Sequence, residues 1–127
     1  MQVTLANYTI AEYCQQMADH KIVVNREYQR SEGVWPPAAR SYLIDTILCG
    51  FPIPKLSLYQ RTDLRTRTTI KEIVDGQQRS TTILSFYNNE FRLTGKGEFT
   101  GKSFVSLEEV EQTKFLDYAL SVDTFCH

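Results

Sequence analysis

The chain has 127 residues, of which 42% are hydrophobic and 23% are charged, and its formal net charge is −1. This composition excludes a disordered chain, and the near-neutral charge gives no overall signal for a nucleic-acid or membrane partner. Three widely spaced cysteines with no CxxC pair, no secretory leader and no apolar run of about 18 residues predict one cytoplasmic domain over residues 1–127, with no membrane partner.

The first predicted helix covers residues 10–19. Thr9 is a good N-cap, and the apolar residues that follow it recur at helical spacing: Ile10, Tyr13, Cys14 and Met17. We expect Cys14 and Met17 to be packing residues. A short buried strand is predicted next, over residues 21–24.

A polar loop over residues 25–35 contains two large aromatic side chains, Tyr28 and Trp35. They either close the edge of the core or form a platform beside a ligand pocket, with Arg30 as a cation. The sequence alone leaves both interpretations open.

The strongest helix signal follows Pro36-Pro37, because proline is well suited to a helix start. A wide apolar stripe predicts the buried face, and Gly50 is expected to end the helix; the stripe consists of Ala39, Tyr42, Leu43, Ile44, Ile47 and Leu48. Arg40 and Asp45 are expected on the polar side.

Residues 51–54 form an extended connector to a predicted hairpin. Its strands cover residues 55–60, where Leu56 and Leu58 share one face, and residues 69–74. Residues 61–68 are expected to be a polar loop. The basic segment of this hairpin could bind DNA phosphates or be an ordinary solvated face; its cations are Arg61, Arg65, Arg67 and Lys71.

Residues 72–82, Glu-Ile-Val-Asp-Gly-Gln-Gln-Arg-Ser-Thr-Thr, predict a strand end, a tight turn and a helix start. Gly76 allows a sharp turn and a close ligand approach, while Arg79 and the helix N-terminus suit an anion such as phosphate. Gln77 and Gln78 could contact a base or sugar edge or order a water molecule. The same residues are also compatible with an ordinary turn in which Asp75 caps the helix and Arg79 pairs with a carboxylate.

The remaining predicted elements are a helix over residues 80–88, a short strand over 91–93 and a final strand over 118–122. Ser106 and Glu109 have the spacing of a capping box for a short helix. Because the chain stops directly after Phe125 and Cys126, we expect the domain to be truncated at its C-terminus.

Several motifs together resemble the N-terminal domain of GmrSD-type, modification-dependent (type IV) restriction endonucleases. They are Tyr28-Gln29-Arg30, Trp35, residues 43–47 (Leu-Ile-Asp-Thr-Ile), Pro52-Ile53-Pro54 and residues 74–82, which contain Asp-Gly-Gln-Gln-Arg. The resemblance covers residues 22–90 most clearly. It implies a single α+β domain of the ParB/sulfiredoxin-like type, with helices packed on a small mixed sheet.

The resemblance also implies a nucleotide-binding regulatory or sensor domain of an anti-phage defence system, with an NTP, and Mg²⁺ as a candidate cofactor. The implied nucleotide site extends from Gly76 to Thr81 and contains Gly76, Gln77, Gln78, Arg79, Ser80 and Thr81. Hydrolysis would be assigned to Asp75, Gln78 and Arg79. The adjoining pocket, which would sense modified DNA, would be lined by Tyr28, Gln29, Arg30 and Trp35.

The sequence departs from the family pattern at Asn25, where many members have proline. It also lacks the His and Asn ligands of an HNH-type nuclease domain, so cleavage is expected from an absent region or a partner chain. Alternatives are a DNA-binding module without nucleotide chemistry and a ParB-like nuclease that uses Glu72, Asp75 and Asp45. Glutamines at positions 77 and 78 argue against sulfiredoxin chemistry, and no P-loop motif is present.

Overall fold

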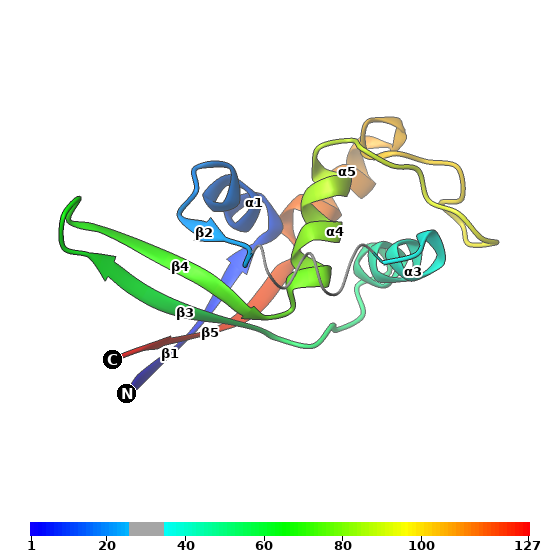
Figure 1. Ribbon diagram of the computed structural model, residues 1–127. Coiled ribbons are helices and arrows are strands. Elements are labelled where there is room, and N and C mark those ends of the chain that lie inside the picture. Colours follow the sequence, from blue (N-terminus) through cyan, green and yellow to red (C-terminus); the bar gives the residue numbers. More distant parts are fainter. Residues whose placement is uncertain (26–34) are drawn as a thin grey trace.

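The computed structural model describes residues 1–25 and 35–127. Its centre is a five-stranded mixed sheet in the order β1-β5-β3-β4-β2 (Figure 1). The strands are β1 (Gln2–Thr9), β2 (Ile22–Val23), β3 (Leu56–Asp63), β4 (Thr68–Asp75) and β5 (Ala119–Cys126). The β3–β5 and β2–β4 pairs are parallel, and the other two pairs are antiparallel.

Helices pack on one face of this sheet (Figure 1). Within the described residues they are α1 (Ile10–Ala18), α3 (Pro37–Leu48), α4 (Gln77–Tyr87), the 3₁₀ turn η1 (Phe104–Ser106) and α5 (Glu109–Asp117). Phe86 of α4 lies at the centre of the core, with its ring 5.2 Å from that of Phe115 and 5.5 Å from that of Phe91. The mixed sheet with packed helices confirms the predicted α+β class.

Helix α1 begins as the sequence predicts. The hydroxyl of Thr9 accepts from the Glu12 backbone N–H at 3.1 Å, and the Glu12 carboxylate accepts from the Thr9 N–H at 2.9 Å. Cys14 is fully buried, and burial raises the pKa of its thiol to about 12. This confirms Cys14 as a packing residue.

Two predicted features are wrong in this part of the fold. Residues 91–93 form no strand: the backbone of Leu93 bonds to that of Gly101 and Lys102, and no strand of the described ranges pairs with this segment. The expected capping box from Ser106 to Glu109 also fails: Ser106 instead accepts from the Ser103 N–H at 2.7 Å within η1. Helix α5 begins after Glu108, which makes no side-chain cap bond.

Three other features differ from expectation in extent. The hairpin strands continue to Asp63 and restart at Thr68, so the polar loop is shorter than predicted. Helix α4 begins at Gln77, three residues earlier than predicted. Tyr42 lies on the solvent side of α3, with 75% of its surface exposed, so the apolar stripe is narrower than expected.

The β3–β4 hairpin extends past its neighbouring strands. Strand β5 pairs with β3 only from Leu56 to Tyr59, and β2 pairs with β4 only at Lys71 and Glu72. Residues 60–70 therefore form a projecting two-stranded ribbon, here called the arm (Figure 1). Within the described ranges, no helix has the length and apolar character needed to cross a bilayer.

Candidate functional site

The turn that leads into α4 depends on Gly76. This residue is the N-cap of the helix and has φ of 92°, in the left-handed region that favours glycine. A Cβ atom at this position would overlap Leu56 Cδ2 and would lie 3.1 Å from Arg79 Nη2. The predicted sharp bend is therefore present, and it is packed tightly against both strand β3 and the arginine. Residues 75–81 are called the α4 corner below.

Arg79 turns into the protein rather than outward. Its Nη1 atom donates to the backbone carbonyls of Pro54 and Lys55, and only 13% of its side-chain surface is exposed. Nη2 lies 3.7 Å from the Asp75 carboxylate, which is itself 71% exposed. The guanidinium therefore bridges the start of α4 to the connector before β3. Asp75 pairs with this arginine but does not cap the helix.

Two residues of the predicted nucleotide site have side chains that are buried. Ser80 is fully buried, and its hydroxyl shares a 2.9 Å hydrogen bond with that of Tyr13. Gln77 is 4% exposed, and its amide donates to the carbonyl of Ile73 at 3.0 Å. Neither side chain lies at the surface, and the assignment of Gln77 and Ser80 to a nucleotide site stays a prediction. Thr81 is half-buried and donates to the Gln78 carbonyl at 3.2 Å.

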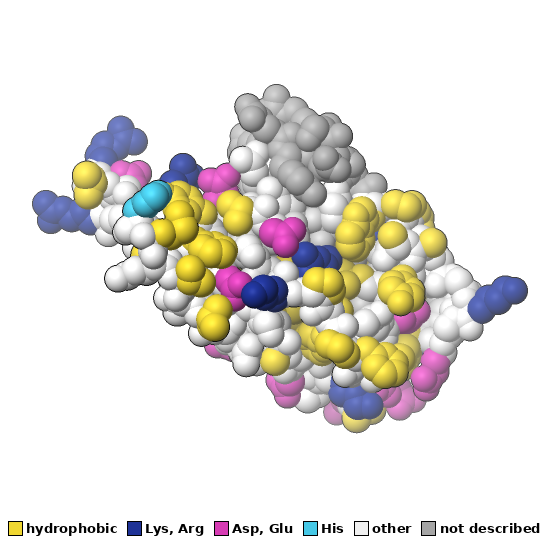
Figure 2. Space-filling model, turned by 90° about the horizontal axis from the view of Figure 1, so that it is seen from below, with side chains coloured by type: hydrophobic (Ala, Val, Ile, Leu, Met, Phe, Trp, Pro, Cys, Tyr) yellow, Lys and Arg dark blue, Asp and Glu magenta, His cyan; other side chains and the backbone are white. Residues whose placement is uncertain are grey.

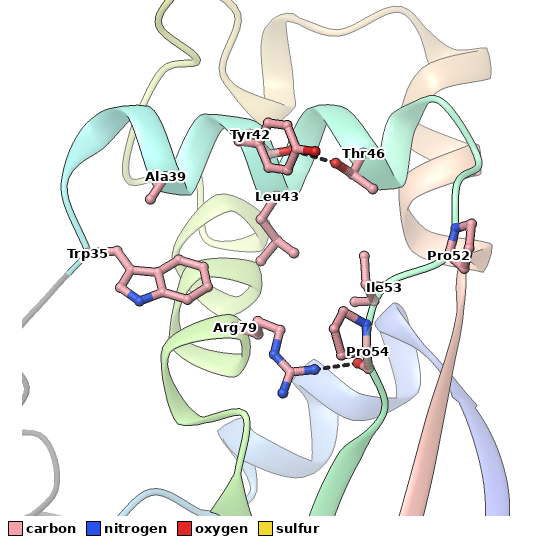
Figure 3. A pocket seen from close by; sticks show the side chains of 9 residues that line it. All are labelled: Trp35, Ala39, Tyr42, Leu43, Thr46, Pro52, Ile53, Pro54 and Arg79. Atoms are coloured by element: carbon pink, nitrogen blue, oxygen red, sulfur yellow. Dashed lines mark hydrogen bonds between the residues drawn. The ribbon is translucent and has the colours of Figure 1, made fainter.

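A cavity of about 520 Å³ adjoins the α4 corner, between α3, the connector and α4 (Figure 3). Its lining is mostly apolar, with Arg79 as the charged group, and consists of Trp35, Ala39, Tyr42, Leu43, Thr46, Pro52, Ile53, Pro54 and Arg79. The Trp35 side chain lies at one end of the cavity and the Pro52–Pro54 segment lies opposite (Figure 3). The Trp35 backbone N–H donates to the Gln78 side-chain oxygen at 3.2 Å, which connects this wall to the α4 corner.

Sequence reasoning placed Trp35 and Arg79 near a pocket but missed most of its wall. The signal that could have found the wall is Pro52-Ile53-Pro54, an apolar connector held extended by two prolines immediately before a buried strand. The predicted pocket residues Tyr28, Gln29 and Arg30 lie outside the described residues.

The four cations of the basic segment fall into two groups. Arg61 pairs with Glu72 at 3.0 Å, and Lys71 donates to the Tyr8 hydroxyl at 2.8 Å. Arg65 and Arg67 are exposed at the end of the arm, where Figure 2 shows a cluster of basic side chains. Glu72, one of the candidate nuclease carboxylates, is held by Arg61 and also accepts from Asn25 at 2.8 Å.

Asp45, another candidate carboxylate, lies on α3, away from Asp75 in the chain. One of its oxygens is buried and has no hydrogen-bond partner in the described part of the chain, and burial raises the pKa of this carboxyl group. Among residues 1–25 and 35–127, no group of three or more His, Cys, Asp or Glu side chains is arranged to hold a metal ion.

Comparison with protein-family models matches residues 10–125 to the GmrSD restriction endonuclease N-terminal domain. The chain belongs to this family. Searches of the curated proteins and of the solved structures found no match. The match covers the cavity, the α4 corner and the arm, so all three are parts of a GmrSD N-terminal domain, and the family indicates a role of the chain in a restriction system.

Proposed function

We propose that this GmrSD N-terminal domain is the nucleotide-binding regulatory domain of a DNA-modification-dependent restriction system. The phosphates of an NTP would lie at the start of α4, and its base would enter the adjoining cavity. The observation that carries the proposal is that Arg79 and Trp35 line the same mostly apolar cavity at a helix N-terminus.

The electrostatics of the α4 corner favour an anion. The first turn of α4 contains Arg79 but no acidic residue, and no side chain caps its N-terminus. The backbone N–H groups of Gln77 and Arg79 precede the first intrahelical bond, from Ser80 N–H to the Gly76 carbonyl. The helix dipole and the guanidinium both place positive charge here, which suits a phosphate group, although the Asp75 carboxylate, 3.7 Å from Arg79 Nη2, offsets part of that charge.

The cavity suits a nucleobase. Its volume lies within the range of about 300 to 1,000 Å³ that is usual for small-molecule sites. An indole ring at one end offers a stacking surface for a planar base, and the prolines opposite add apolar contact without ordering flexible side chains.

Hydrolysis of the nucleotide would use the exposed Asp75 carboxylate beside Arg79, with Gln78 to orient water. Mg²⁺ is commonly held by one or two carboxylates together with phosphate oxygens, and Asp75 is the carboxylate of the α4 corner that could serve it. When bound, the ion would neutralise phosphate charge. Arg79, braced by the two carbonyls, would keep its own charge fixed at the cavity wall.

Isothermal titration calorimetry with ATP and GTP, with and without MgCl₂, tests this proposal. Trp35→Leu should weaken binding roughly 5- to 100-fold, the range expected when base stacking is lost. Arg79→Lys keeps the charge but loses the planar fork, and it should also weaken binding. Arg65→Ala, which removes an arginine from the arm, is the matched control and should bind like the parent chain. Equal affinity in all four proteins would overturn the proposal.

A second candidate function is a DNA-binding module that uses no nucleotide chemistry. It is favoured by the exposure of Arg65 and Arg67, which project from the domain without an acidic partner in the described part of the chain. This candidate predicts an affinity for duplex DNA that falls steeply with salt and does not change when nucleotide is added. DNA binding that requires ATP or GTP would count against it.

A further inference from the structure

The arm is built to hold its end away from the domain in a fixed shape. Its ladder pairs Gln60 with Lys71, Arg61 with Ile70, Thr62 with Thr69 and Asp63 with Thr68. Neither β5 nor β2 extends along it, so no other strand in the described part of the chain pairs with either edge of the ribbon (Figure 1). A ribbon of this kind contributes little to the core, which leaves its side chains available for contact with a partner.

The turn at the end of the arm is held by Asp63. Its carboxylate accepts from the Arg65 N–H at 2.9 Å, and its carbonyl accepts from the Arg67 N–H at 2.7 Å. The hydroxyls of Thr66 and Thr68 add a 2.7 Å bond. The one acidic residue of the arm is therefore used to shape the turn, and the Arg65 and Arg67 side chains remain exposed.

Leu64 lies at the same turn and is 88% exposed, the highest value among the exposed large hydrophobic residues of the described ranges. Arg65 follows it directly, and Arg67 is three residues away. Residues 60–70 carry three arginines and one aspartate, a net charge of +2, although the whole chain has a net charge of −1. The end of the arm thus presents one exposed apolar side chain, Leu64, close to two exposed cations.

We propose that the arm enters a groove of duplex DNA, with Arg65 and Arg67 on backbone phosphates and Leu64 against the bases. The inference deepens the DNA-binding candidate and is independent of the nucleotide site. Paired strands lie about 4.8 Å apart, and the major groove, about 12 Å wide, admits a two-stranded ribbon. Arginines supply the phosphate contacts that position such a ribbon, and an apolar side chain in the major groove can contact the methyl group of thymine.

An anionic lipid surface also attracts basic and apolar residues. DNA is favoured because the chain belongs to a family of restriction endonuclease domains and because the cations lie at the end of a narrow ribbon rather than on a broad amphipathic face. The two partners are separated in the experiment below.

Fluorescence anisotropy with a labelled DNA duplex, repeated over a series of salt concentrations, tests the inference on the whole chain. The double variant Arg65→Ala/Arg67→Ala should bind more weakly, and the slope of log affinity against log salt should fall by about 2, or about 1 for each phosphate contact. Leu64→Ser should lower affinity at every salt concentration and leave the slope unchanged, because it removes no charge.

The matched control is Lys96→Ala/Lys102→Ala, which removes two exposed cations from the loop at the opposite end of the molecule (Figure 1). This control should bind DNA like the parent chain.

If the parent binds DNA and the arm variants match the control, the arm inference fails while DNA binding by another surface stands. If the parent binds phosphatidylserine vesicles through the arm and does not bind DNA, both the inference and the second candidate fail. Calorimetry with ATP and GTP on the same variants should be unaffected, since the arm is separate from the α4 corner.

Discussion

Arg79 in the α4 corner and Arg65 in the arm are the same residue type on neighbouring elements, and their surroundings are opposite. Arg79 is almost buried and bonds to the carbonyls of Pro54 and Lys55, whereas Arg65 is exposed at the end of a ribbon. The first holds the molecule together and places a charge at a cavity wall. The Arg65 side chain makes no evident contribution to the fold, so we expect it to act through a contact outside the chain.

The largest expected loss of stability in the α4 corner, compared with the arm, follows from substitution of Gly76. Gly76→Ala should destabilise the protein by about 3 kcal/mol or more, because the left-handed φ costs about 1 to 2 kcal/mol and overlap with Leu56 adds a packing penalty. Urea unfolding measures this loss. Gly101→Ala is the control: its φ is 83°, but no atom lies within 4 Å of the added Cβ, so only the backbone cost of about 1 to 2 kcal/mol is expected. Equal losses would show that Leu56 moves aside freely.

Substitution of Arg79 is expected to cause the next largest loss of stability. Arg79→Ala should cost about 1 to 3 kcal/mol of unfolding free energy, because it leaves the carbonyls of Pro54 and Lys55 without their donor. Arg65→Ala should change stability by less than about 0.5 kcal/mol, as expected for an exposed side chain. If both variants unfold at the same urea concentration, the contrast between a bracing and a projecting arginine is wrong.

The Tyr13–Ser80 hydrogen bond joins α1 to the first turn of α4, next to the α4 corner, and its contribution to stability can be measured. Burial raises the pKa of the Tyr13 hydroxyl, which therefore stays protonated and bonded to Ser80. Tyr13→Phe should cost about 1 to 2 kcal/mol, since the Ser80 hydroxyl is left buried without its partner. Thermal unfolding followed by circular dichroism measures the loss, and Tyr42→Phe, at an exposed position, should show none.

The smallest effect is expected at the end of the arm. Leu64→Ser should leave the urea midpoint within about 0.5 kcal/mol of the parent, because Leu64 is already in water. A clear loss of stability would mean that Leu64 packs within the protein, and the arm would then resemble the α4 corner rather than contrast with it.

The core helices and strands could be predicted well because their buried apolar residues recur at the regular spacing of a helix or a strand. The apolar residues of α1, and Leu56 with Leu58 of β3, are buried as their spacing indicates. Strand β1 went unpredicted because it is an edge strand: Val3 and Leu5 are 49% and 73% exposed, so its existence depends on pairing with β5 rather than on a buried face. The hairpin was predicted too short for the same reason, since ladder bonds rather than apolar alternation extend it.

The candidate site was predictable in outline only. Gly76 and Arg79 could be singled out from their residue types alone. Glycine is favoured where the backbone turns sharply, and arginine carries a charge that needs a partner. Local sequence does not specify that Gln77 and Ser80 face inward, because that depends on the direction in which α4 leaves the turn. The cavity depends on three segments far apart in the chain, at Trp35, Pro52–Pro54 and Arg79, and its lining cannot be read from any one of them.

The pairing of the first and last strands has a practical consequence. Gln2 lies opposite Cys126 in the β1–β5 ladder, so the two chain ends are adjacent (Figure 1). In this 127-residue chain, a short linker between residues 1 and 127 would allow circular permutation, with new ends in the exposed turn near Gly95 and Lys96. Such a permutant would carry a fluorescent fusion partner at its new ends, and it would leave both the α4 corner and the arm in continuous chain.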